Sequence, residues 1–263
     1  MAKYRPIIVG CGKQGVGENQ EVSEKIINFA DAFSKHEGFD KICFVDQRNI
    51  KAIEAMEKYG GWATTIRYAC EALRVNVAVV ATPDDTHYTV LKELANCSLK
   101  LVICEKPLCT NLNQAREIVE LYKAKGIPLM VNYTRRYLPE YNKLKEYGKP
   151  IDGVLSFNRG WLHTASHGID FFEMLGLKDY QIRQIQAEEF RIWDLTVYFD
   201  SGVRWNEQRI GDSMPVWSYY DYSHWHVIDN AFNFLEGKAP IKCTGEDALK
   251  TLEICYRLME GAK

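Results

Sequence analysis

Short, unbroken apolar runs recur through the first half of the sequence. They lie within YRPIIVG, KICFVD, VNVAVVATP, LKLVICEKP and IPLMVNY. Runs that are apolar at every position are typical of strands buried on both faces of a parallel sheet. Segments with helical spacing lie between them, so the pattern predicts right-handed βαβ units and a doubly wound α/β domain.

The clearest of these helices is NLNQAREIVELYKAKG, residues 111–126. Apolar residues recur through it at helical spacing, at Leu112, Ala115, Ile118, Val119 and Tyr122. We expect Asn111 to cap the amino end of this helix and Gly126 to stop it.

The pattern changes after about residue 130. WDLTVYFDSGVRW alternates with period two about an Asp200-Ser201-Gly202 turn, which predicts an antiparallel hairpin. IDGVLSFNRGW indicates a further strand, and the helical HTASHGIDFFEMLG follows it. Two closing helices are expected in VIDNAFNFLEG and TGEDALKTLEICYRLM, the second with a capping-box-like start at Thr244 and Asp247. The second half is therefore predicted to be α+β.

Composition and charge narrow the class of protein. The 263 residues are 46% hydrophobic and 26% charged, with a formal net charge of −2. This charge gives no reason to expect nucleic acid or a membrane as partner, and no apolar stretch reaches the roughly 18 residues of a membrane span. The first residues lack a signal-peptide pattern. The eight cysteines form no C-x-x-C pair, so we expect free thiols and a cytoplasmic location.

A glycine motif directly follows the first apolar run. Gly10, Gly12 and Gly15 spell G-x-G-x-x-G within IIVGCGKQGVG. Such a turn lets a pyrophosphate approach the backbone and face the start of the next helix. The motif alone is weak because glycine-rich turns are common, but its place after the first strand strengthens it. We expect the whole loop to bind the cofactor, through Gly10, Cys11, Gly12, Lys13, Gln14 and Gly15.

The second apolar run ends at Asp46. A carboxylate there accepts hydrogen bonds from both ribose hydroxyls and repels a 2′-phosphate, which favours NAD. Gln47 and Arg48 follow it, and NADP stays open because an arginine can hold that phosphate. Asp46 lies 36 residues after Gly10, more than the usual separation of about 20. We therefore expect an insertion or an extended helix between them.

Five motifs in order resemble the Gfo/Idh/MocA oxidoreductase family, which includes glucose–fructose oxidoreductase and inositol dehydrogenase. The glycine motif is followed by ATPDDTH at 81–87, CEKPL at 104–108, VNYTRRYLPEY and a G…H-x-x-D helix, so the resemblance spans residues 7–176. It implies an α/β protein with an N-terminal Rossmann dinucleotide-binding domain, residues 1–130. The rest, residues 131–263, would be a shortened α+β substrate-binding domain with an open, mainly antiparallel sheet, whose last helix packs back on the first domain.

The resemblance also assigns roles to residues at the strand ends. Thr82 and Pro83 would line the dinucleotide with His87 beside it, and Glu105 and Lys106 would reach the nicotinamide. Lys106 would hydrogen-bond the reacting oxygen. The residues agree with this, since Lys106 follows a buried strand at its carboxyl end, where ligands of open α/β sheets bind. The bond to Pro107 is of the type that adopts the cis form.

The stretch HTASHGID holds two histidines four positions apart, His163 and His167. Residues four apart on a helix share a face, so a zinc site, with His224 and His226 supplying further ligands, is one alternative. The glutamate of zinc hydrolases is absent after His163, however, and we expect no metal. Ordinary polar residues on a helix surface are a second alternative. The favoured one is proton transfer, for which imidazole's pKa of about 6.5 is suited.

By the resemblance, H-x-x-D maps onto His167, the catalytic acid/base, and Asp170. His163 departs from the aspartate of inositol-dehydrogenase-like members; it would relay a proton or contact a substrate hydroxyl or phosphate. From their chemistry alone, Arg135 and Arg136 in TRRY could bind a phosphate or carboxylate or form ion pairs on the surface; we expect Arg135 to contact the substrate. The predicted catalytic set is therefore Lys106, His167 and His163, and the substrate-binding set is Lys106, Arg135, His163, His167 and Asp170.

The favoured function is an NAD(P)-dependent dehydrogenase acting on CH–OH groups of a sugar, cyclitol or nucleotide-linked sugar. The first alternative is the same hydride step within a non-redox net reaction with retained NAD, as in NAD-dependent glycosidases. The second is a non-catalytic sensor of a dinucleotide or sugar. The resemblance also implies a homo-oligomer, either dimer or tetramer.

Overall fold

The computed structural model describes residues 4–17, 25–186, 191–210 and 222–261. The chain forms two compact units, the first from Met1–Tyr137 and Tyr220–Leu249, the second from Leu138–Tyr219 and Lys250–Lys263. This differs from the predicted boundary between 130 and 131. The reason is that a long segment near the end of the chain returns to the first unit, while most of the last helix groups with the second.

The first unit is built on a six-stranded parallel sheet with the order β3-β2-β1-β4-β5-β6. Its strands are β1 (Pro6–Val9), β2 (Cys43–Val45), β3 (Trp62–Ala63), β4 (Val77–Val80), β5 (Leu101–Glu105) and β6 (Leu129–Asn132). Every residue of β1, β4, β5 and β6 is buried, which confirms the predicted burial on both faces. The strand order reverses at β1, where open α/β sheets bind their ligands.

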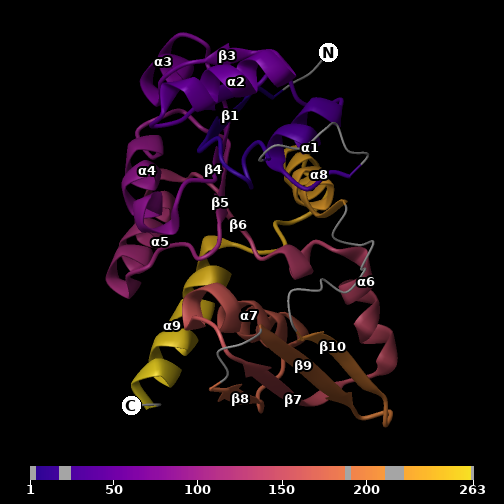
Figure 1. Cartoon of the computed structure of the whole chain (residues 1–263). Helices are drawn as coiled ribbons and strands as arrows, with labels where there is room; N and C mark the ends of the chain where they lie inside the picture. The colour runs from indigo at the N-terminus through magenta and orange to yellow at the C-terminus, as the bar shows by residue number, and fades with distance from the viewer. Residues whose placement is uncertain (1–3, 18–24, 187–190, 211–221, 262–263) are drawn as a thin grey trace. The chain divides into compact units, whose positions relative to one another are not determined.

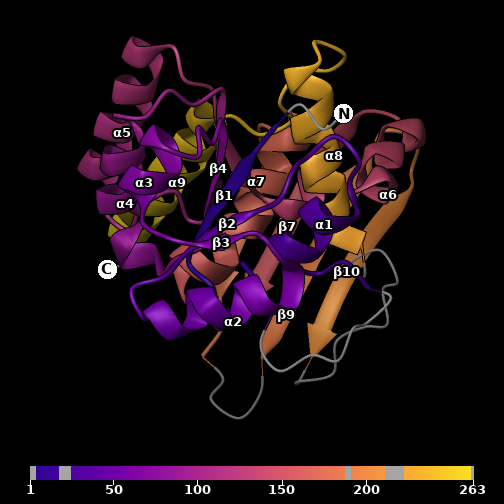
Figure 2. The same ribbon diagram turned by 90° about the horizontal axis from the view of Figure 1, so that it is seen from above.

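Helices cover this sheet on both faces. They are α1 (Phe29–Lys35), α2 (Asn49–Tyr59), α3 (Ile66–Glu71), α4 (His87–Leu94), α5 (Leu112–Lys125) and α8 (Ser223–Leu235), with 3₁₀ turns η1 (Asp84–Thr86) and η2 (Thr134–Arg136). In Figures 1 and 2, α4 and α5 lie on one side of the sheet and α1 and α8 lie together on the other. The predicted caps of α5 are confirmed: the Asn111 side chain accepts from two backbone amides, and Gly126 ends the helix with a φ of 65°.

The helix that follows the glycine motif is interrupted. Gly12 to Gly17 form one helical turn, in which Val16 N–H donates to the Gly12 carbonyl over 2.9 Å. At α1, the N–H of Phe29 donates to Gln14 and that of Ala30 to Gly15, over 3.0 and 2.9 Å. The hydrogen-bond ladder thus continues from the first turn into α1 across a chain insertion, which explains the long separation of Gly10 from Asp46.

Helix α8 closes the first unit against α1. The Phe232 ring packs on His36 at 4.7 Å between centroids and on Phe39 at 6.0 Å. Gly38 lies directly beneath this ring, because a Cβ there would collide with Phe232. The Tyr4 hydroxyl donates to the Leu235 carbonyl over 3.0 Å. The end of α8 is therefore fixed by residues from the first part of the chain.

The second unit holds a four-stranded sheet with the order β10-β9-β7-β8. Its strands are β7 (Pro150–Phe157), β8 (Gln181–Gln184), β9 (Ile192–Phe199) and β10 (Arg204–Ile210), accompanied by α6 (Pro139–Asn142), η3 (Lys143–Tyr147), the π-helical turn η4 (Trp161–Ala165), α7 (Ser166–Leu175) and the later part of α9 (Gly245–Gly261). β9 runs antiparallel to β7 and β10, whereas β8 is parallel to β7. The predicted hairpin and the mainly antiparallel sheet are confirmed.

Helix α7 presses closely on β7. A Cβ at Gly168 would meet the Leu155 side chain at 2.6 Å, and one at Gly153 would meet the Phe172 ring at 2.7 Å. The absence of a side chain at these two glycines lets α7 approach β7 closely.

The structure tests two expectations drawn from the sequence, that the cysteines are free thiols and that no segment spans a membrane. All eight cysteines are free thiols, six of them buried. In the part of the chain that the structure describes, no helix has both the length and the apolar character needed to cross a membrane.

Candidate functional site

The three glycines of the first loop have different surroundings. A Cβ at Gly10, whose φ is +100°, would lie 2.6 Å from the backbone of Ala81 and Thr82. A Cβ at Gly15 would collide with the Gly10 carbonyl. At Gly12, a Cβ would meet no atom within 4 Å. Gly10 and Gly15 thus allow close packing, while Gly12 leaves an open space over the loop.

This open space lies at the start of a helix. Gly12 begins the turn that continues into α1, and the first amides of a helix have no intrahelical acceptor and carry its positive end. Lys13 and Gln14 are exposed beside it. An anion that approached Gly12 would therefore meet backbone N–H groups and a lysine.

Asp46 is held next to this loop. Its Oδ2 accepts the Cys11 N–H and its Oδ1 accepts the Arg48 N–H, both over 2.8 Å. The carboxylate is half-buried, while Gln47 and Arg48 are exposed. The carboxylate thus has a fixed orientation at the end of β2 and retains lone pairs for a further donor.

His87 joins the loops that follow β4 and β5. Its ring nitrogens lie 2.8 Å from the Pro107 carbonyl and 3.0 Å from the Thr82 carbonyl, and the residue is 1% exposed. Burial lowers the pKa of this imidazole. The side chain therefore fixes two loops from beneath, and the dinucleotide contact that the resemblance implies for it stays a prediction. Thr82 is half-buried and Pro83 is exposed.

The carboxyl end of β5 brings together residues from three elements. Glu105 is 8% exposed, and its Oε1 accepts the Asn132 amide from β6 over 2.7 Å. The Nε2 of His224, from α8, lies 3.9 Å from the same oxygen. Lys106 follows and is half-buried, and its bond to Pro107 is cis, as expected for this pair.

The sequence reasoning missed Asn132, and it considered His224 only as a possible zinc ligand and not as a neighbour of Glu105. Asn132 ends a strand next to the one that ends at Glu105, so strand adjacency was a usable signal. Nothing in SHWH marks His224 as a neighbour of Glu105, because that contact depends on where α8 docks.

Arg135 lies in the turn η2 after β6 and is 8% exposed, as is Arg136. Arg136 donates to the Lys242 carbonyl over 3.3 Å and lies 3.5 Å from an Asp247 carboxylate oxygen. Arg136 therefore ties the end of β6 to the start of α9. The substrate contact expected of Arg135 stays a prediction.

In the second unit, the histidine stretch begins with a π-helical turn. His163 lies in this turn and is exposed, whereas His167 lies in the first turn of α7 and is half-buried. The regular α-helix predicted for the stretch thus begins only at Ser166. Short π-helical turns occur often at functional sites.

Asp170 is 1% exposed and accepts the Thr251 hydroxyl of α9 over 3.3 Å. This places the carboxylate on the buried face of α7, inside the second unit. The contact holds α7 to α9, and the substrate contact that the resemblance implies for Asp170 stays a prediction. Within the described ranges, no three histidine, cysteine, aspartate or glutamate side chains are grouped closely enough to hold a metal ion.

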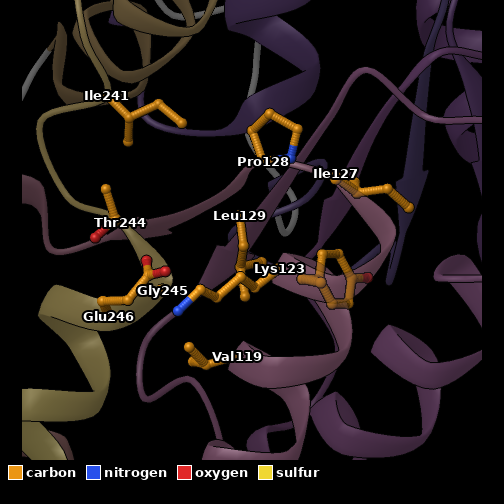
Figure 3. A pocket seen from close by; sticks show the side chains of 11 residues that line it. Val119, Lys123, Ile127, Pro128, Leu129, Ile241, Thr244, Gly245 and Glu246 are labelled. Atoms are coloured by element: carbon orange, nitrogen blue, oxygen red, sulfur yellow. The ribbon is translucent and has the colours of Figure 1, made fainter.

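A pocket of about 290 Å³ lies elsewhere in the first unit (Figure 3). Val119 and Lys123 of α5, Leu129 of β6 and Glu246 of α9 contribute to its walls. It lies at the amino end of β6, whereas the glycine loop follows the carboxyl end of β1. In a parallel sheet these are opposite edges, so this pocket is not the dinucleotide site.

Comparisons with known proteins agree with the dinucleotide-binding fold that the glycine loop predicts. Residues 5–133 match the family model GFO_IDH_MocA, described as an oxidoreductase family with an NAD-binding Rossmann fold. An oxidoreductase from Formosa agariphila is 28% identical over 141 residues, 53% of this chain and 40% of the relative. An inositol 2-dehydrogenase from Rubrobacter xylanophilus is 36% identical over 94 residues, 35% of this chain and 27% of the relative. These matches thus span less than half of each relative's length.

The resemblance in fold extends further. The crystal structure of a dehydrogenase from Chromobacterium violaceum superposes with a TM-score of 0.79 at 10% identity, covering 99% of this chain and 96% of that chain. At this identity the likeness concerns the fold alone. It confirms the predicted combination of a Rossmann unit with a second α+β unit.

Proposed function

We propose that this chain, which resembles the Gfo/Idh/MocA oxidoreductases in sequence over its first half and in fold over its length, is an NAD-dependent dehydrogenase. It would move a hydride between nicotinamide and a CH–OH carbon of a sugar, cyclitol or nucleotide-linked sugar. The observation that carries the proposal is the open space over Gly12, at a helix start and next to the fixed Asp46 carboxylate.

The residues of the first unit fit a dinucleotide. The pyrophosphate would lie over Gly12 and the first amides of the turn, with Lys13 beside it. The two oxygens of Asp46 would accept hydroxyls of the adenosine ribose. Their negative charge supports NAD over NADP. When bound, NAD supplies the hydride acceptor that no side chain provides.

Two side chains of this chain would handle the proton. His167 would take the hydroxyl proton during oxidation and return it during reduction, since a half-buried imidazole suits this exchange at neutral pH. A protonated Lys106 would stabilise the alkoxide that develops on the substrate. These two roles come from the resemblance, and His163 would assist as a relay.

The relatives support the substrate class. The Rubrobacter xylanophilus relative is an inositol 2-dehydrogenase, so a ring carbon that bears a hydroxyl among other hydroxyls is the chemistry to test first. Sugars and cyclitols share this feature. Replacement of the usual aspartate by His163 supports a substrate whose polar groups differ from those of inositol.

The proposal is tested with His167→Ala and Lys106→Ala. Each variant should keep dinucleotide affinity nearly unchanged and lose turnover by about 100- to 10,000-fold, as for lost acid–base catalysis. The double variant should lose less than the product of the two, because both groups serve one transition state. His163→Ala should lose less than either. Reduced-nicotinamide absorbance across a panel of cyclitols, sugars and nucleotide-sugars provides the measurement.

Different outcomes identify the alternatives. Full activity of His167→Ala on a confirmed substrate would mean that another group transfers the proton. A dinucleotide that co-purifies and stays bound through many turnovers without net reduction would indicate the retained-NAD reaction. Binding without turnover of any substrate would indicate a sensor.

A further inference from the structure

A buried imidazole nitrogen without a hydrogen-bond partner lies in the interior of the first unit. His224 is 5% exposed, and its Nε2 has no hydrogen-bond partner among the described residues. Its Nδ1 lies 3.2 Å from the Ser223 hydroxyl, and the Phe29 ring packs edge-on against the imidazole at 4.6 Å. Most buried polar atoms are hydrogen-bonded, so this nitrogen requires an explanation.

The nearest group to this nitrogen is the buried carboxyl of Glu105, 3.9 Å away. Burial raises the pKa of Glu105, while the Asn132 amide and the Lys106 charge oppose that rise. Burial also lowers the pKa of His224 to about 3 and keeps the neighbouring Cys104 thiol protonated. Glu105 therefore does not readily lose its proton, and His224 does not readily gain one.

We propose that Glu105 and His224 form a proton-holding pair, in which Glu105 carries the proton and His224 Nε2 faces it as acceptor. The proton is released to solvent when a positively charged nicotinamide occupies the carboxyl end of β5. A distance of 3.9 Å exceeds a hydrogen bond by about 1 Å, which a small side-chain rotation closes. The second step rests on the proposed function, because the resemblance is what brings nicotinamide to Glu105 and Lys106. His224 is then a positioning residue for Glu105.

This pair gives the two redox forms of the cofactor different pH dependences. The oxidised nicotinamide ring is a cation and favours an ionised Glu105, whereas the reduced ring is neutral. Below the raised pKa of Glu105, NAD⁺ must displace a proton to bind. Its affinity should then rise with pH by up to about tenfold per unit, and that of NADH should stay nearly constant.

The pair is tested first without cofactor, by carbon NMR of the full chain carrying carboxyl-labelled glutamate. Glu105 is assigned by the signal lost in Glu105→Gln, and it should titrate above the ordinary glutamate range. His224→Phe should lower its midpoint by about one pH unit, the worth of one hydrogen bond, and His224→Gln, which keeps an acceptor, should restore it. An unchanged midpoint in His224→Phe overturns the pair. Should that variant not fold, the nitrogen shift of His224 Nε2 decides: it must change in Glu105→Gln.

The coupling to the cofactor is tested by calorimetric titration with NAD⁺, NADH and ADP-ribose between pH 5 and 8. Only NAD⁺ should show the rise in affinity with pH, and Glu105→Gln should abolish it. Equal pH dependence for NAD⁺ and ADP-ribose, which lacks nicotinamide, overturns the coupling. If none of the three binds, the proposed function fails and the coupling with it, while the NMR titration still decides the pair.

Discussion

Single residues of the glycine motif serve two distinct purposes. Gly10 and Gly15 are required by close backbone contacts inside the protein, whereas Gly12 has nothing within 4 Å of a hypothetical Cβ. The first two are therefore needed for folding, and the third leaves room for the pyrophosphate of the proposed cofactor. Sequence spacing identified the motif but could not separate these purposes, because they depend on the strand-end loops that pass beside it.

Gly12→Ala and Gly15→Ala should consequently change different properties, the affinity for NAD in the first and the stability of the fold in the second. Gly12→Ala should melt like the parent protein and bind NAD at least about tenfold more weakly, a loss of roughly 1.4 kcal/mol, because the methyl group holds the pyrophosphate away. Gly15→Ala should lose about 1–3 kcal/mol of stability through overpacking. Urea unfolding and NAD titration of both variants provide the comparison. Unchanged NAD affinity in Gly12→Ala would move the pyrophosphate elsewhere.

The Asp46 carboxylate should determine the choice of cofactor. The parent protein should bind NAD more tightly than NADP, and Asp46→Ala should narrow the gap by removing both the ribose hydrogen bonds and the repulsion of the 2′-phosphate. Asp46→Asn is the matched control, since an amide oxygen still accepts one loop N–H. Fluorescence titration with NADH and NADPH measures the gap. Tighter NADPH binding by the parent protein would make Arg48 the phosphate ligand.

Other site residues show the limit of prediction at this scale. Asp46 and the glycine loop could be predicted because they are close to strand ends that the apolar runs mark. The burial of His87 and Asp170 could not, since each is covered by residues from other parts of the chain, Pro107 and Thr251 respectively. The same motif spacing is compatible with a side chain on the buried face or on the exposed face of its helix.

At the level of elements, the interrupted helix explains the one spacing that did not fit. The ladder from Gly12 through Gly15 is resumed by Phe29 and Ala30. The sequence indicated an insertion, and its limits are marked by Gly17, whose φ is +83°, and by Asn28, the N-cap of α1. The helix start remains next to the glycine motif, so the insertion does not displace the end that we propose to bind the pyrophosphate.

The cap of α5 offers a test of local stability. The Asn111 side chain accepts from the Asn113 and Gln114 amides over 2.9 and 3.1 Å. Asn111→Ala should therefore lower the free energy of unfolding by about 1 kcal/mol, while Asn111→Asp should retain it. Chemical denaturation followed by circular dichroism measures both. Equal loss in the two variants would contradict the cap as the cause.

The π-helical turn before α7 marks the limit of periodicity. Apolar spacing predicts a helix through HTASHGID, and a helix is found, but its first turn is wider than an α-turn. One extra residue in a turn leaves the apolar pattern nearly unchanged. The relative orientation of His163 and His167 therefore could not be derived from their separation of four positions.

At the level of the whole molecule, the fold class could be predicted and the division of the chain could not. Parallel strands, the helices between them and the antiparallel second sheet all follow from apolar patterns. The return of residues 220–249 to the first unit cannot be predicted from these patterns. Helix α8 is amphipathic in sequence, and its pattern does not identify the surface that it covers.

Buried histidines should make the protein sensitive to acid. Burial lowers the pKa of His224 to about 3 and lowers those of His87 and His36 as well. The unfolded chain binds protons at these residues below about pH 6.5, but the folded chain does not. Stability should thus fall as pH decreases from 6.5, by up to about 1.4 kcal/mol per unit for His224.

Urea midpoints at pH 7, 6 and 5 measure this effect. His224→Phe should show a shallower decline than the parent protein, since it removes the most strongly shifted histidine. Identical slopes for the two proteins would show that the pKa of His224 does not differ between the folded and the unfolded chain.

The docking of α8 has a consequence for the order of events during synthesis. All six strands of the parallel sheet have been synthesised once the chain reaches Asn132. Phe232, which covers His36 and Phe39, is made only after the strands of the second unit. Until then the rings of His36 and Phe39, which follow α1, are left uncovered on the nascent chain. The first unit is therefore completed only after the strands of the second unit have been made, and a chain that stops after residue 137 would leave the surface covered by α8 exposed, a natural substrate for chaperones.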